Sequence, residues 1–126
     1  MRAEIGLVAG FRTKDVEDHD ELFKWHLCVC DTTHQYLFVC GRQYEGDYQL
    51  TNLECSGLYY QVSYISMRAV LFRPKIPANA RLGCRLPISY LRGLYEHIKA
   101  SEVMSPINKQ KVLPGLARKI SEKNAC

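Results

Sequence analysis

The hydrophobic pattern of the chain changes its period once, and this change limits the folds that the chain can adopt. Up to about residue 75 the apolar residues alternate in short runs that are typical of β-strands. After about residue 86 they recur at helical spacing, with Leu91, Leu94, Tyr95 and Ile98 on one face. A sheet made by the first part and covered by helices from the second would bury both apolar surfaces.

The strands of this sheet are predicted from six segments. In FKWHLCVC the side chains of Trp25, Leu27 and Val29 face one way, and Lys24, His26, Cys28 and Cys30 face the other. The turn DTTH then leads into QYLFVC, which predicts a hairpin. The other four are EIGLVAGF, a loop around YQL that could carry a short strand, the run LYYQVSYISMRAVLFR, which is long enough for two strands or one bent one, and an edge strand from Arg81 to Leu86. Between the first two strands, TKDVEDHDELF is acidic and predicts an exposed loop or a short helical turn.

A second helix is predicted after the first. Ser105 is a good N-cap and Pro106 a good first helical residue, and Pro114 with Gly115 predicts the end of this helix. The whole chain, residues 1–126, is therefore expected to be one α+β domain, with five or six strands in a partly closed sheet and one or two C-terminal helices.

Composition narrows the setting in which the protein is expected to work. No secretory signal is visible, and no apolar run reaches the roughly 18 residues that a membrane span needs. We therefore expect a cytoplasmic protein with no membrane partner and with its six cysteines reduced. The net charge of +4 is concentrated in residues 99–126, which suits an acidic partner such as a nucleic acid or an acidic protein, although a solvated helix face with a frayed tail is the commoner explanation.

The segment KWHLCVCDTTHQYLFVC contains three cysteines and two histidines, which raises the question of a metal site. On an extended strand Cys28 and Cys30 would lie roughly 6 to 7 Å apart, too far for both to bind one zinc ion. We therefore expect buried thiols with no metal and no cofactor. The alternative is a local bulge that lets His26 or His34 complete a metal site.

Two groups of polar residues are candidates for chemistry. Lys24 and His26 share one side of a strand, where they could act as charge stabiliser and general base. Ser66 and Arg68 share one side of the later strand, and Arg42 follows the hairpin. Tyrosines follow nearby and offer ring faces for stacking on single-stranded RNA, although tyrosine also simply favours strands: Tyr44, Tyr48, Tyr59 and Tyr60.

The order of these elements resembles the PemK/MazF-like toxins of bacterial toxin–antitoxin systems. The resemblance lies in KWHLCVC, YLFVCGR, ECSGLYYQVSYISMRAV and YLRGLYEHIKASEVMSPINKQKVLPGL, over roughly residues 24–116. It implies a small SH3-like, partly open barrel, a homodimer, an antitoxin protein as partner and metal-independent cleavage of single-stranded RNA. Lys24 and His26 stand where the family has an Arg-Pro pair, and Thr33, or less well Ser66, matches its catalytic Ser or Thr.

Three functions follow as hypotheses. The first is a toxin-like, metal-independent endoribonuclease, in which Lys24, His26 and Thr33 face Ser66 and Arg68 across a basic groove. The second is a non-catalytic module on the same barrel that binds a protein or a nucleic acid. The third is a protein that binds a small molecule or a metal.

Overall fold

The computed structural model describes residues 1–13 and 22–124, in which seven strands precede two helices. The predicted α+β class and the order of strands before helices are therefore confirmed. The acidic segment predicted as a loop lies mostly outside the described residues. The elements are β1 (Leu7–Thr13), β2 (Leu22–Cys30), β3 (Gln35–Cys40), β4 (Tyr48–Thr51), β5 (Val62–Ile65), β6 (Leu71–Phe72), β7 (Arg81–Arg85), α1 (Ile88–Ala100) and α2 (Pro106–Asn124).

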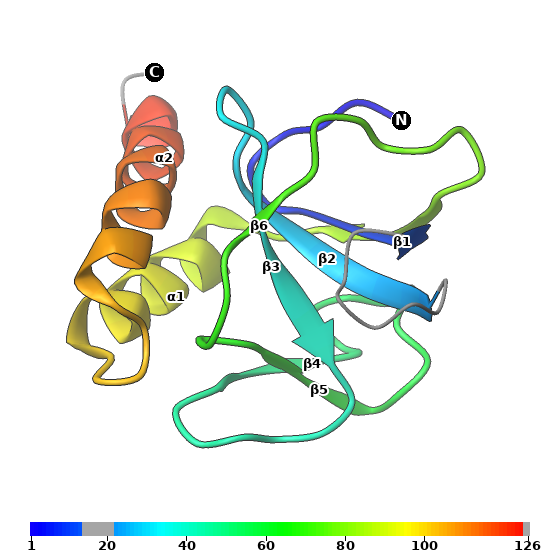
Figure 1. Cartoon of the computed structure of the whole chain (residues 1–126), viewed down its shortest axis with the longest axis horizontal. Coiled ribbons are helices and arrows are strands. Elements are labelled where there is room, and N and C mark those ends of the chain that lie inside the picture. The colour runs from blue at the N-terminus through cyan, green and yellow to red at the C-terminus, as the bar shows by residue number, and fades with distance from the viewer. Residues whose placement is uncertain (14–21, 125–126) are drawn as a thin grey trace.

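The strands form one antiparallel sheet in the order β4-β5-β3-β2-β1-β7, and β6 pairs with the first residues of β3. The described part of the sheet has seven strands against the five or six expected, and the long run after residue 57 forms two of them, β5 and β6. The sheet curls into a half-barrel, and Figure 1 shows both helices gathered on one side of it. The opposite end, where β1 stops and β2 starts, is left free of helices (Figure 1).

The predicted hairpin is formed by β2 and β3, whose pairing sets Trp25 opposite Val39 and Cys28 opposite Tyr36. His34 closes its turn in the left-handed region, with φ of 58°. The register of the β2–β3 pairing shifts between Cys28 and Cys30, so the side chains of these two residues lie in different surroundings. The alternation predicted for FKWHLCVC holds through Cys28, with Leu27 and Val29 in the main core and Cys28 in a smaller cluster.

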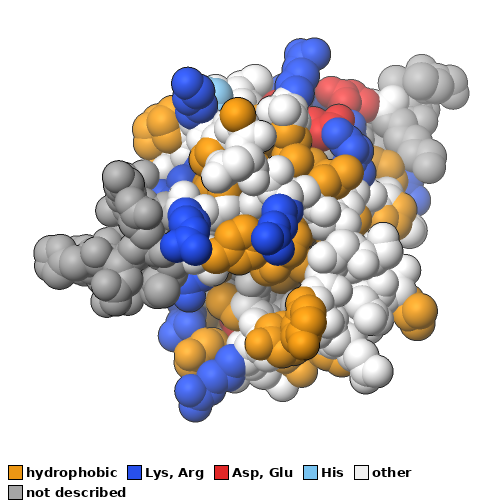
Figure 2. Space-filling view, turned by 90° about the vertical axis from the view of Figure 1, so that its right-hand side faces the viewer, with side chains coloured by type: hydrophobic (Ala, Val, Ile, Leu, Met, Phe, Trp, Pro, Cys, Tyr) orange, Lys and Arg blue, Asp and Glu red, His pale blue; other side chains and the backbone are white. Residues whose placement is uncertain are grey.

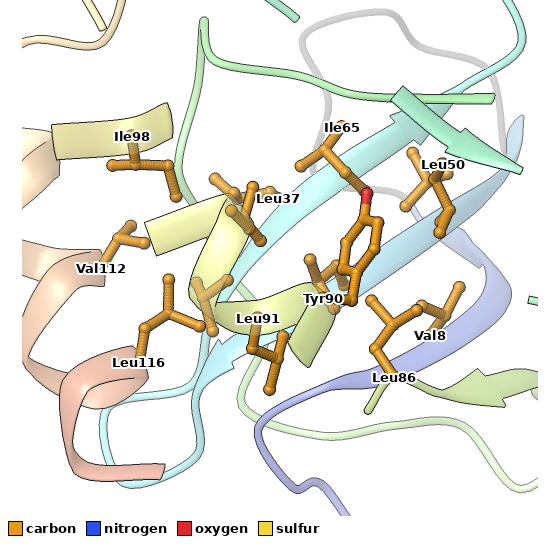
Figure 3. Close-up of a cluster of buried hydrophobic side chains, with 14 of the residues drawn as sticks. Val8, Leu37, Leu50, Ile65, Leu86, Tyr90, Leu91, Ile98, Val112 and Leu116 are labelled. Atoms are coloured by element: carbon orange, nitrogen blue, oxygen red, sulfur yellow. The ribbon is translucent and has the colours of Figure 1, made fainter. Parts of the chain in front are cut away.

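The main core lies between the concave sheet and the helices. Figure 3 shows side chains of α1 and α2, such as Leu91, Ile98 and Leu116, gathered in one cluster with Leu37 and Ile65 of the strands. Leu91, Leu94 and Ile98 are fully buried, as the helical spacing predicted. Tyr95 is only half-buried, and the buried tyrosine of this helix is Tyr90 instead. The hydroxyl of Tyr90 donates a hydrogen bond of 2.7 Å to the carbonyl oxygen of Gln49.

The second helix starts as predicted and ends later than predicted. The hydroxyl of Ser105 accepts a hydrogen bond of 3.2 Å from the N–H of Asn108, which is the expected N-cap. The helix then continues through Pro114 to Asn124, so the predicted end at Pro114 and Gly115 is wrong. Tertiary contact explains this, because Gly115 lies against the backbone of Val29, where a side chain would clash.

The expectation that every cysteine is reduced is also wrong. Cys55, in the turn after β4, forms a disulfide with Cys84 of β7, and their Cα atoms lie 5.1 Å apart. The N–H of Gly57 donates a hydrogen bond of 2.9 Å to the carbonyl oxygen of Gly83 beside it. The curl of the sheet brings these segments together. A separation of 29 residues in the sequence gives no sign of this proximity.

Neither of the two helices is at once long enough and apolar enough to cross a lipid bilayer, as far as the described residues go.

Candidate nucleic-acid interface

A groove with a volume of about 620 Å³ opens where β2 starts and β3 ends. We call it the basic-aromatic groove because its polar lining consists chiefly of the cations Lys24, Arg42 and Arg68. Its aromatic lining consists of Phe23, Trp25, Phe38, Tyr44 and Tyr60. No acidic side chain is among the described residues that line it, so the charged groups of this lining are all positive and attract a negatively charged ligand.

The two arginines of the groove gather at one tyrosine ring. The guanidinium carbon of Arg68 lies 3.6 Å from the centre of the Tyr44 ring, and that of Arg42 lies 5.4 Å from it. Such cation–π contacts hold guanidinium groups in place while their N–H donors remain available. Two positive charges are thereby held together at one end of the groove.

Buried Asp47 fixes this end of the groove. One carboxylate oxygen accepts a hydrogen bond of 3.0 Å from the N–H of Tyr44, and the other accepts one of 3.2 Å from the N–H of Met67. The loop after β3 and the segment after β5 are thereby joined through one side chain. Asp47 is a positioning residue, because it sets Tyr44 beneath Arg68.

Tyr60 closes the groove from the side and depends on a glycine. Its ring lies directly on Gly41, where an added Cβ would stand 2.9 Å from a ring carbon. The ring also meets Tyr59 edge to face, at 5.2 Å between centroids. More than half of the Tyr60 surface remains exposed, which leaves ring area available for stacking.

Phe23 and Trp25 form the far wall of the groove. Their rings meet edge to face with centroids 5.5 Å apart, and Phe23 is 40% exposed. Figure 2 looks onto the side of the molecule where β1 ends and β2 begins, and shows Lys and Arg side chains set around hydrophobic ones there.

His26 lies outside the groove, which corrects the arrangement predicted from the sequence. It is fully buried, and its ring stacks on Phe11 with centroids 4.0 Å apart and planes 3° from parallel. Nδ1 donates a hydrogen bond of 3.0 Å to the carbonyl oxygen of Lys24, and Nε2 is buried with no hydrogen-bonding partner among the described residues. Burial, together with the charge of Arg73, lowers the pKa of His26 to about 4. The ring is therefore neutral at physiological pH and out of reach of a ligand.

The other predicted site residues are also dispersed. Thr33 lines a separate cavity of about 440 Å³ beside α2, with Cys30 and Arg118. Ser66 is buried, and its hydroxyl accepts a hydrogen bond of 3.3 Å from the N–H of Arg68. Tyr48 packs against Tyr90 of α1. The predicted residues that the fold brings together in the groove are therefore Lys24, Arg42, Tyr44, Tyr60 and Arg68.

Three cysteines of β2 and β3 are free thiols: Cys28, Cys30 and Cys40. Cys28 and Cys30 are both buried, as predicted. Desolvation, with a smaller effect from Asp31, raises the pKa of Cys28 to about 12. Burial also raises the pKa of Cys40, which lines the groove, so its thiol is protonated at neutral pH. No group of three or more potential metal ligands comes together within residues 1–13 and 22–124.

Phe23 and Trp25 line the groove and Asp47 fixes one end of it, and all three were missed from the sequence. The alternating F-K-W at the start of β2 was a usable signal for the first two, because aromatic residues flank a lysine there. Asp47 had no such signal, since its partner Met67 is twenty residues away.

Comparison of the chain with models of known protein families, with curated proteins and with solved structures finds no match in any of the three.

Proposed function

We propose that the protein binds single-stranded RNA in the basic-aromatic groove. The observation that carries the proposal is the meeting of three cations and exposed aromatic rings in one groove that no described acidic residue lines. Single-stranded nucleic acids are bound by this combination, because cations neutralise the phosphates and flat rings stack on the bases. The choice of RNA over DNA rests on the resemblance to PemK/MazF-like toxins.

Binding is supported better than cleavage. Metal-independent cleavage through the ribose 2′-hydroxyl needs a group that accepts a proton at neutral pH. His26, the candidate for this role, is buried and stacked on Phe11, and the groove thiol Cys40 is protonated. Toxin-like endoribonuclease activity is therefore the narrower proposal, and the non-catalytic binding module is the broader one.

Fluorescence anisotropy with a labelled twelve-nucleotide RNA tests the binding proposal. Lys24→Ala, Arg42→Ala and Arg68→Ala should each weaken binding, and each should lower the salt slope by about 0.7 if one phosphate contact is lost. Lys99→Ala is the matched control, because it removes one exposed positive charge from α1 at a residue that does not line the groove. Equal losses in all four variants, or no binding by the wild type, would overturn the proposal.

The same RNA run on a denaturing gel tests cleavage. Products formed by the wild type and lost in Lys24→Ala with Arg68→Ala would support the endoribonuclease. Binding with intact RNA would support the non-catalytic module.

We further propose a homodimer on an SH3-like barrel, with an antitoxin as a protein partner. Support comes from the curled sheet and from exposed apolar side chains such as Leu53 and Tyr59, which are 94% and 88% exposed. Light scattering of the purified protein measures the oligomeric state. A cytoplasmic location is also a proposal, and the redox state of Cys55 and Cys84 in cell extracts bears on it, because disulfides persist mainly in oxidising compartments.

A further inference from the structure

A second, smaller pocket of about 350 Å³ adjoins the basic-aromatic groove. Phe11, Arg12, Phe23, Asn79 and Arg81 line it, so Phe23 is shared by both hollows. We call it the Arg81 pocket. It lies across β2, β1 and the start of β7, and the pairing of these strands sets Gly10 opposite both Trp25 and Arg81.

Because Gly10 has no side chain, the ring of Phe23 can lie over β1 and border both the groove and the Arg81 pocket. An added Cβ at this position would collide with the ring of Phe23, which therefore lies across β1 toward β7. The guanidinium carbon of Arg81 stands 5.5 Å from the centre of that ring. Trp25 and Phe23 of β2 and Arg81 of β7 are consequently linked across β1, with the ring of Phe23 lying over Gly10.

The chemistry of the Arg81 pocket matches that of the groove. Arg81 supplies a forked set of N–H donors, and the amide of Asn79 supplies donors and an acceptor. No acidic residue is among its described lining residues. A phosphate therefore suits this pocket, and an apolar ligand does not, because charged and amide groups would lose their hydration.

We propose that an RNA strand bound in the basic-aromatic groove continues past Phe23 and places a further backbone phosphate in the Arg81 pocket. This inference rests on the proposed function, because the groove must hold the strand first. Phe23 provides a ring on which a base can stack between the two hollows, and Arg81 with Asn79 holds the phosphate beyond it. The site size of the protein is then longer than the groove alone would give.

Oligouridines of four to twelve nucleotides, measured by anisotropy at low salt, test this inference. Wild-type affinity should rise with length until both hollows are filled. Arg81→Ala should weaken binding of the twelve-mer by about tenfold and leave the four-mer unchanged, because only the longer strand reaches the pocket. Arg81→Lys should restore part of the loss, and Asn79→Ala should weaken the twelve-mer selectively. Lys99→Ala is again the charge-matched control.

The outcomes separate this inference from the proposed function. If Arg68→Ala loses binding while Arg81→Ala shows the same rise of affinity with RNA length as the wild type, the role given to the Arg81 pocket would be overturned and the proposed function would stand. Equal losses for four-mer and twelve-mer in Arg81→Ala would also overturn it, because Arg81 would then act on the groove itself. Equal competition by a polyglutamate peptide of matched charge would overturn the assignment to RNA.

Discussion

The guanidinium group of Arg68 covers one face of the Tyr44 ring, at 3.6 Å from its centre, and so joins two loops that are far apart in the sequence. Backbone N–H groups of both loops also donate hydrogen bonds to the carboxylate of Asp47. The positions of Arg68 and Tyr44 are therefore fixed by the fold, unlike those of two independent surface side chains. The groove should therefore respond to changes at a residue that never touches the ligand.

Asp47→Ala should lower the free energy of unfolding by about 1 to 3 kcal/mol, because two N–H donors lose their acceptor. Urea unfolding measures the loss, and anisotropy should show weaker RNA binding by the folded variant. Glu45→Ala, at an exposed position in the same loop, is the control and should unfold like the wild type. Equal stability of the two variants would contradict the role given to Asp47.

The buried imidazole of His26 should make the protein sensitive to mild acid. The pKa of His26 is about 4 in the folded state and near 6.5 in the unfolded state, so the unfolded state binds more protons between these values. Stability should therefore fall as the pH drops from about 6.5 to 4, by about 3 kcal/mol in total.

Unfolding curves at a series of pH values, for wild type and His26→Phe, measure this effect. The variant should lose the dependence in that window. His34→Asn should keep it, since asparagine tolerates the positive φ of that turn residue. A wild-type profile that stays flat from pH 6.5 to 4 would mean that His26 is not buried as described.

Leu94→Ala should cost about 2 to 5 kcal/mol, because Leu94 is fully buried between α1 and the sheet. Ile107→Ala is the comparison on α2, where the side chain is 68% exposed, and its effect should stay within about 0.5 kcal/mol. Chemical denaturation of both variants is sufficient. A loss below 0.5 kcal/mol for Leu94→Ala would place this residue at the surface.

Replacing Cys55 and Cys84 by serine should destabilise the protein by about 3 to 4 kcal/mol, because the unfolded chain would no longer be closed into a loop. Thermal unfolding with and without a thiol reductant makes the same comparison in the wild type. Cys40→Ser is the control, since Cys40 is a free thiol. Identical melting of oxidised and reduced wild type would argue against this disulfide.

Local patterns predicted most of the secondary structure. The alternation around Trp25, the spacing of Leu91, Leu94 and Ile98, and the cap at Ser105 all depend on neighbours within a few residues, and these features are present. The end of α2 was missed because the contact of Gly115 with Val29 is tertiary and outweighs the local preference of proline and glycine.

The candidate site was predicted only in part, for a related reason. Alternation on a strand shows which side chains share a face, but it does not show whether another element covers that face. Here Phe11 of β1 covers His26, while Lys24 on the same face lines the groove. Thr33 lies at the other end of the hairpin from Lys24, so closeness along the hairpin did not become closeness in space.

The Cys55–Cys84 bond also has a mechanical consequence. It makes residues 55–84 a covalent ring that contains β5, β6 and most of β7, together with Tyr60 and Arg68. If the two ends of the chain were pulled apart, tension would pass through the sulfur atoms and bypass this ring. The fully stretched oxidised protein should then be shorter than the reduced one by about 100 Å, with one wall of the groove shielded from the force.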